Sequence, residues 1–125
     1  MEPGINGIDK LRRAREILEA ELATAVVSSE FNVRLKRFRA TLRDGTTINV
    51  QYNDHEEYSY SIFYSSQELD RIRFDNYDNL WNVPTKPHHV HPRYKEVGEI
   101  STMNGDPVND MRILANILKS TGASP

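Results

Sequence analysis

Residues 31–75 form four successive runs in which apolar and polar side chains alternate. Alternation with a period of two places the apolar side chains on one face of a β-strand and the polar ones on the other. Short polar turns separate the runs, and Asp44-Gly45 is a strong hairpin signal because both residues tolerate a positive φ. The pattern predicts an antiparallel meander, and no other feature of the sequence constrains the fold as tightly.

The first run, over residues 31–43, contains one change of phase. Phe31 and Val33 occupy alternate positions, whereas the apolar residues that follow Lys36 fall on the intervening ones. We interpret this change as a β-bulge near Lys36-Arg37, which keeps both apolar sets on one face of a single strand. The other three strands are predicted at residues 47–52, 57–64 and 69–75.

Two stretches with helical periodicity flank the predicted strands. Residues 8–26 are rich in good helix formers, and their apolar residues recur along one helix face. Asp106-Pro107 begins the second stretch, because aspartate caps free N–H groups and proline suits the first helical position. We predict a C-terminal helix over 106–119. Residues 76–103 are predicted as a loop with one or two short strands.

These elements predict a single α+β domain over residues 1–125. An antiparallel sheet of about four to six strands, centred on residues 30–75, is flanked by the two helices in a two-layer arrangement. A length of 125 residues fits one domain.

The composition excludes several classes of protein. The absence of cysteine excludes a disulfide scaffold, a thiol nucleophile and thiolate metal ligands. No apolar run approaches the ~18–20 residues that span a membrane, and the N-terminus does not read as a signal peptide. We therefore expect a cytoplasmic protein without a membrane partner.

Basic residues are unevenly distributed although the net charge is only −2. Residues 31–43 contain arginines and a lysine but no acidic residue. Such a run is typical of the solvated face of a hairpin, and it also fits a patch that binds nucleic acid. Tyr58, Tyr60 and Tyr64 fit buried core positions better than platforms on which bases stack.

The last predicted strand carries the first of two clusters with chemical potential. Arg71, Arg73 and Asp75 are spaced two apart, so they point to one face, and Asn76 follows directly. Arginine can hold a phosphate with its planar fork of donors, and a carboxylate can orient a histidine. A purely structural reading is also open, with an ion pair between Arg73 and Asp75 and a turn cap at the end of the strand.

Histidines form the second cluster, in the segment Pro87-His88-His89-Val90-His91-Pro92. The flanking prolines favour extended backbone, in which His89 and His91 share a face and His88 points away. Such a pair suits proton transfer near neutral pH, and its spacing also suits a metal site with Asp75 or His55 as third ligand. Ordinary surface or loop-bonding histidines would fit the same pattern.

Together the two clusters form a workable set for metal-independent RNA cleavage or for binding a phosphate-containing ligand. In the catalytic hypothesis, Arg73 holds the phosphate, His89 and His91 exchange protons, and Asp75 orients a histidine. The alternative is a non-catalytic binding or protein-interaction module. The catalytic candidates are His89, His91, Arg73 and Asp75, and the ligand-binding candidates are Arg71, Asn76 and His88. The residue pattern alone identifies no cofactor.

The order of these elements and motifs resembles the TumE family. The likeness covers residues 27–119, and its specific parts are Arg73-Phe74-Asp75-Asn76 and Pro87-His88-His89-x-His91. The Asp-Gly hairpin and the Tyr58-Ser59-Tyr60 strand are consistent with it. Members of this family are small prokaryotic proteins encoded as the toxin partner of toxin–antitoxin pairs. The resemblance therefore implies a toxin role and a cognate antitoxin as partner, and it implies no particular reaction.

One departure from the family pattern concerns metal binding. Family members often carry a further histidine pair shortly after the Asp-Asn motif. In this chain that stretch is Tyr77-Asp78-Asn79-Leu80-Trp81, which contains no histidine. A metal site that needs those extra histidines would be incomplete here.

Overall fold

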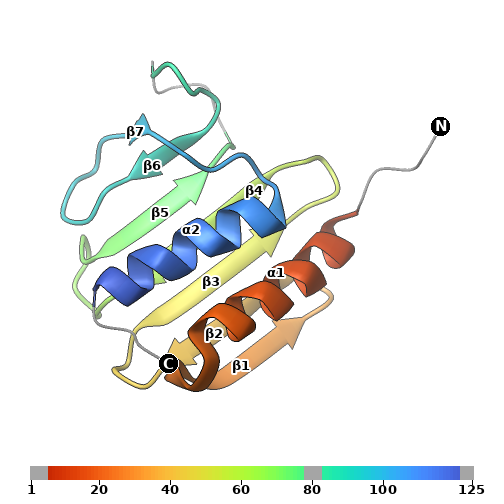
Figure 1. Cartoon of the computed structure of the whole chain (residues 1–125). Helices are drawn as coiled ribbons and strands as arrows, with labels where there is room; N and C mark the ends of the chain where they lie inside the picture. The colour runs from red at the N-terminus through yellow and green to blue at the C-terminus, as the bar shows by residue number, and fades with distance from the viewer. Residues whose placement is uncertain (1–5, 78–82, 122–125) are drawn as a thin grey trace.

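The computed structural model describes residues 6–77 and 83–121. In this part of the chain, a seven-stranded antiparallel sheet with the order β1-β2-β3-β4-β5-β6-β7 is covered on one face by two helices (Figure 1). The helices are α1 (Gly7–Leu22) and α2 (Pro107–Ser120). The strands are β1 (Val26–Asn32), β2 (Arg37–Leu42), β3 (Thr47–Tyr52), β4 (Tyr58–Phe63), β5 (Arg71–Asp75), β6 (His89–His91) and β7 (Glu99–Ile100). The predicted α+β class with two flanking helices is confirmed.

The number of strands differs from the four to six predicted. The single strand expected over 31–43 is a hairpin, in which β1 pairs with β2 and Phe31 lies opposite Phe38. Lys36 adopts a φ of 52° in the connecting turn. The change of phase that we interpreted as a bulge at Lys36-Arg37 therefore marks this turn, because a four-residue connection shifts the alternation just as one inserted residue does.

The N-terminal helix also ends earlier than predicted. It stops at Leu22 rather than at residue 26, and a short 3-10 turn η1 (Ala23–Ala25) leads into β1. Ala23 has a φ of 46°, which is incompatible with continuing the helix. The β-branched Val26 and Val27 belong to β1, where the register with β2 shifts between Val26 and Ser28.

The core lies between the helices and the face of the sheet that they cover. Alternate residues of the central strands are buried there, as the period-two pattern predicted. Tyr58 and Tyr60 are among them, with ring centroids 4.7 Å apart, so both are core residues as expected. The helix side of the core contains Leu11, Ala14, Leu18, Met111, Leu114 and Leu118.

A buried carboxylate, which the sequence pattern did not single out, anchors the start of α2. Asp110 is fully buried and accepts hydrogen bonds from the Tyr60 hydroxyl at 2.6 Å and from the backbone N–H groups of Asn104 and Gly105 at 3.0 and 2.7 Å. Burial raises the pKa of Tyr60 and of its neighbour Tyr52 well above the usual value, so both hydroxyls stay protonated. The network ties the second helix to β3 and β4.

The predicted cap at the start of this helix is also confirmed. The Asp106 side chain accepts a hydrogen bond from the Asn109 N–H at 2.9 Å, and Pro107 occupies the first turn. These two residues satisfy or remove donors that the helix start would otherwise leave without partners.

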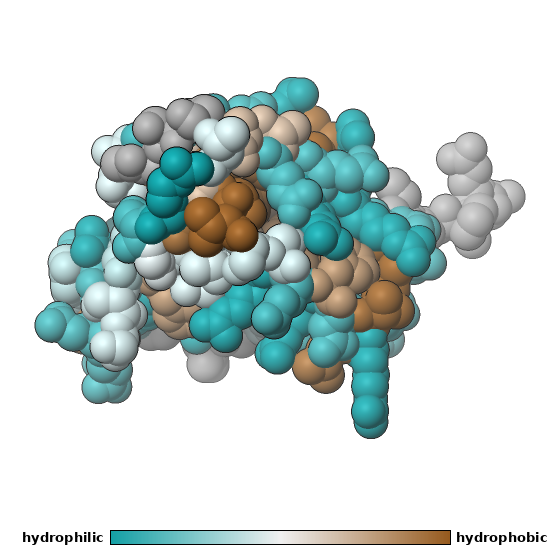
Figure 2. Space-filling view, turned by 90° about the horizontal axis from the view of Figure 1, so that it is seen from below, coloured by the Kyte–Doolittle hydropathy of each residue, from teal (hydrophilic) through white to brown (hydrophobic). Residues whose placement is uncertain are grey.

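In the described part of the chain, no helix covers the opposite face of the sheet (Figure 1). The residues that alternate with the buried ones along the central strands point to this face. Figure 2 shows the molecule from below, where hydrophilic side chains cover most of the surface and apolar ones emerge in small separate areas. Neither helix of residues 6–77 and 83–121 is long and apolar enough to cross a bilayer. We call the uncovered side the open face.

Candidate functional site

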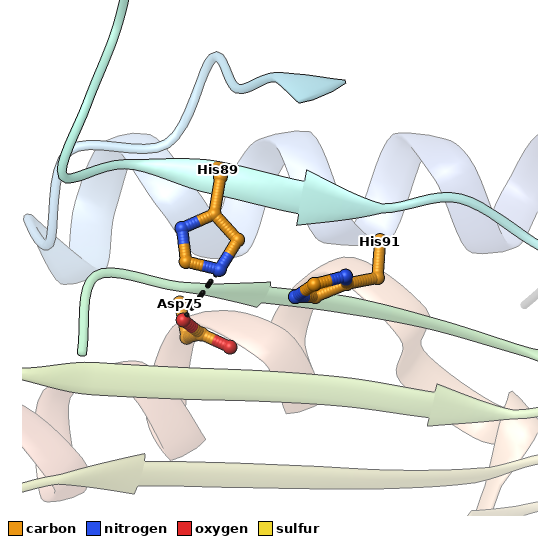
Figure 3. Close-up of side chains that lie close together, drawn as sticks. All are labelled: Asp75, His89 and His91. Carbon is orange, nitrogen blue, oxygen red and sulfur yellow. Dashed lines mark ion pairs between the residues drawn. The ribbon is translucent and has the colours of Figure 1, made fainter. Parts of the chain in front are cut away.

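The pairing of β5 with β6 brings the two predicted motifs together. In this register Asp75 lies opposite His89, and Arg73 lies opposite His91. All four residues belong to the open face, because the residues between them pack into the core on the other side. Figure 3 shows that the side chains of Asp75, His89 and His91 converge. The four residues proposed as catalytic therefore form one group, which we call the Asp–His cluster.

Asp75 is the centre of this cluster. One carboxylate oxygen, Oδ1, lies 2.9 Å from Nε2 of His89, and the other, Oδ2, accepts a hydrogen bond from Nε of Arg73 at 2.9 Å. The side chains of Asp75 and His89 are 6% and 2% exposed, whereas that of Arg73 is 48% exposed. The cluster thus combines buried acid–base groups with one guanidinium at the solvent edge.

Backbone carbonyls select the tautomer of both imidazoles. Nδ1 of His89 lies 3.0 Å from the Pro87 carbonyl oxygen, and Nδ1 of His91 lies 3.2 Å from the Glu96 carbonyl oxygen. Because a carbonyl only accepts, each Nδ1 carries a hydrogen and donates it. In the neutral form of either ring, Nε2 is then the atom with a lone pair.

This tautomer determines what lies between His89 and Asp75. A lone pair on Nε2 and a carboxylate oxygen 2.9 Å apart would repel each other. The contact is attractive only when a proton or another cation lies between the two atoms. The geometry therefore indicates a proton, or a cation in its place, between Asp75 and His89.

His91 has a different electrostatic environment. Burial lowers its pKa below the usual value for histidine, and the positive charge of Arg73 adds to this effect. Its ring is edge-on to that of His89, with centroids 4.8 Å apart. His91 is therefore neutral at pH 7, with a tautomer that can accept a proton at Nε2.

The same three residues have the composition of a metal site. One ligand atom from each of Asp75, His89 and His91 lies within 4.8 Å of the others. Two imidazoles and a carboxylate form a common donor set for zinc and other transition metals. Histidine ligands of a metal usually donate their second ring N–H to a carbonyl or carboxylate, which orients the ring. The Nδ1–H groups of His89 and His91 donate to backbone carbonyls in this way.

The predicted ligand-binding residues make contacts outside the cluster. Arg71 donates to the carbonyl oxygens of Pro92 and Lys95, each at 2.8 Å, and so fixes the segment after β6. Asn76 accepts a hydrogen bond from the Tyr58 N–H at 2.9 Å, and Nδ1 of His88 lies 2.9 Å from the Tyr58 hydroxyl.

Asn76 and His88 line a different hollow, which has a volume of about 630 Å³. The alternative third metal ligand His55 also lines this hollow, together with Lys10 and Glu56. The structure thus brings Asp75, rather than His55, to His89 and His91. The stretch Asp78–Trp81, which includes the tryptophan and much of the departure from the family pattern, lies outside the described residues.

Ser61 is a neighbour of the cluster that the sequence did not point to. It lies on β4 opposite Arg73 and belongs to the open face. A serine in an alternating strand carries no distinctive signal, and only the strand register shows what lies beside it.

Comparison with known proteins agrees with this arrangement. The sequence model of the family described as Toxin TumE matches residues 8–118. The chain belongs to the TumE family. The match includes both motifs of the cluster and confirms the resemblance to this family. No curated protein and no solved structure matches the chain.

Proposed function

We propose that this TumE-family protein is a toxin that acts on RNA at the Asp–His cluster. The family match supports the toxin role. The observation that carries the rest is the convergence of Asp75, His89 and His91 beside the half-exposed guanidinium of Arg73. A proton acceptor, a held proton and a phosphate-binding group are the parts that metal-independent cleavage of RNA requires.

In the proposed reaction, the ribose 2′-hydroxyl next to the scissile phosphate is the nucleophile. His91 accepts its proton at Nε2, and the 2′-oxygen attacks phosphorus while the bond to the 5′-oxygen breaks. The proton held between His89 and Asp75 passes to the departing 5′-oxygen. Arg73 neutralises the charge that develops on the phosphate oxygens. The products are a 2′,3′-cyclic phosphate and a 5′-hydroxyl.

A toxin role also implies a cognate antitoxin, so we propose a protein partner encoded with this chain. The alternative function, a non-catalytic interaction module, would need the same kind of partner without any chemistry at the cluster. The two hypotheses differ in what the histidines do. If the chain is an interaction module, its complex with the partner protein should depend on the hairpin surface and should be insensitive to substitution of His89 and His91.

The test is incubation of purified protein with single-stranded RNA in the presence of EDTA. We expect fragments with 2′,3′-cyclic phosphate ends, and a rate that His91→Asn lowers by about 10²- to 10⁴-fold. His55→Asn is the matched control, because His55 is exposed and lines the separate hollow. Equal cleavage by wild type and His91→Asn would show that the catalytic assignment is wrong. Intact RNA with wild type would favour the interaction module.

A further inference from the structure

The strand register extends the cluster sideways across the open face in two polar rows. The first row starts at His91 on β6 and continues in register to β1 through Arg73, Ser61, Asn49, Arg39 and Glu30. The second row starts at His89 on β6 and continues through Asp75, Ser59, Gln51, Arg37 and Asn32. A chain that crosses the strands along these rows would meet polar side chains at every step.

Short side chains lie between long ones along the rows, and we call the strip from Arg73 on β5 to Arg37 and Arg39 on β2 the trough. β4 contributes only serines, Ser59 and Ser61, and Ser61 is 8% exposed. Arg73 of β5 lies on one side of them, and the arginines of β2 lie on the other side, beyond Asn49 and Gln51 of β3. Because neighbouring strands lie ~4.8 Å apart, the three strand spacings from Arg73 to Arg39 cover about 14 Å. That distance corresponds to about four nucleotides at the ~3.4 Å spacing of a stacked strand.

The far end of the trough carries positive charge that the fold does not use. Arg37 and Arg39 are exposed, and neither takes part in an ion pair with another residue of the ranges 6–77 and 83–121. Both point away from the core, since Phe38 and Ala40 are buried on the other face. Glu30 lies opposite Arg39 on β1 and places a negative charge at the edge of the sheet.

A hollow of about 620 Å³ adjoins this end of the trough. Arg39 and Asn49 line it together with Phe63, whose side chain emerges from β4 on the open face and is 37% exposed. An exposed aromatic ring beside an arginine and an amide offers a stacking surface and hydrogen-bonding groups for a base.

We propose that a single strand of RNA binds across β4, β3 and β2 in this trough. Its phosphates lie on Arg73, Arg39 and Arg37, one base stacks on Phe63 in the hollow, and the strand enters the Asp–His cluster at its other end. The inference rests on the proposed function and names the form of the substrate. Glu30 ends the path by repelling a further phosphate.

The burial of the cluster favours a single strand over a duplex. His89 and His91 are 1% and 5% exposed, so a scissile phosphate has to leave the line of the strand and approach the cluster from the side of the half-exposed Arg73. A single strand can bend and unstack in this way, whereas the phosphates of an A-form duplex are held on a rigid cylinder. Within the described residues, neither helix lies on the open face, where it could enter a duplex groove.

The test measures binding by fluorescence anisotropy, with a short single-stranded oligonucleotide whose 2′-O-methyl groups prevent attack by the 2′-oxygen. We expect Arg37→Ala/Arg39→Ala to weaken binding at least about tenfold. The slope of log K against log salt should become shallower by about 1.4, since each lost phosphate contact contributes ~0.7 for single strands.

The matched control is Arg12→Ala/Arg112→Ala, which removes the same charge from exposed positions on α1 and α2. This control should bind within about twofold of wild type, because it lies outside the trough. Equal losses in both double variants, or tight binding by Arg37→Ala/Arg39→Ala, would overturn the inference. So would equal affinity for a duplex of the same sequence, or equal competition by polyglutamate, which would assign the face to an acidic polypeptide.

Cleavage kinetics separate this inference from the proposed function. If wild type cleaves RNA, Arg37→Ala/Arg39→Ala should raise KM and leave kcat unchanged, because both arginines lie strands away from the reacting phosphate. Unchanged KM would overturn the trough alone. If wild type binds the oligonucleotide in the trough but cleaves no RNA, the proposed function fails and the binding surface stands.

Discussion

Substitution of Asp75 separates the stability of the cluster from its charge. The carboxylate contacts Nε2 of His89 and Nε of Arg73, each at 2.9 Å. Asp75→Asn can keep both contacts, because its amide oxygen accepts from Arg73 and its N–H donates to Nε2 of His89. This geometry is available only because Nδ1 of His89 already donates to the Pro87 carbonyl oxygen. Asp75→Ala removes both contacts.

The expected magnitudes follow from the exposure of the two partners. A hydrogen bond to a charged group contributes about 1.5–3 kcal/mol. The guanidinium of Arg73 is 48% exposed and can turn to water, so its share is small. The imidazole of His89 is 2% exposed and cannot turn to water. Asp75→Ala should therefore lower the free energy of unfolding by about 2–4 kcal/mol, and Asp75→Asn should lower it by about 1 kcal/mol.

Thermal and urea unfolding, followed by circular dichroism, measure these costs. At about 3–5 °C per kcal/mol for a domain of this size, Asp75→Ala should lower Tm by roughly 6–20 °C and Asp75→Asn by no more than about 5 °C. Both variants should cleave RNA far more slowly than wild type, since neither holds the proton. If Asp75→Asn is as unstable as Asp75→Ala, the tautomer that we assign to His89 is wrong.

Three further predictions concern the cluster and the core. Folding lowers the pKa of His91 below the value of ~6.5 for an unfolded histidine. Its contribution to stability should therefore be complete above about pH 6.5 and be lost as the pH falls toward the lower folded value. The midpoint of urea unfolding should show this loss in wild type but not in His91→Asn, and an equal dependence of the midpoint on pH in the two proteins would contradict it. Asp110→Ala should lower the free energy of unfolding in urea by about 3–5 kcal/mol, because it removes the acceptor of the buried Tyr60 hydroxyl and of two partly buried backbone N–H groups. A loss below about 1 kcal/mol would refute this. Zinc should raise Tm and slow RNA cleavage by taking Nε2 of both histidines, and Asp75→Ala should abolish both effects; an unchanged Tm in excess zinc would show that the three residues do not bind it.

The sheet was largely predictable because alternation has the same meaning in every strand. The errors fall where two local structures produce one pattern. A turn and a bulge both shift the phase near Lys36, so alternation alone does not distinguish the hairpin of β1 and β2 from one bulged strand. Val26 continues an apolar stripe at helical spacing, yet it pairs with Leu42 of β2, because β-branched residues favour extended backbone.

The candidate site was predictable to the extent that it depends on neighbours within a strand. The spacing of Arg73 with Asp75, and of His89 with His91, placed each pair on one face. Their convergence required the pairing of β5 with β6, which no spacing specifies. Arg71 turns to backbone carbonyls of the segment that follows β6, and a contact with a loop leaves no trace in the sequence pattern.

Growth of cells that express the chain without an antitoxin tests the central claim most directly. The claim is that toxicity arises at the Asp–His cluster. Induced wild type and His55→Asn should both arrest growth, whereas His91→Asn, expressed to the same level as folded protein, should leave growth unchanged. Growth arrest by His91→Asn as strong as that by wild type would contradict the assignment of the toxic activity to this cluster.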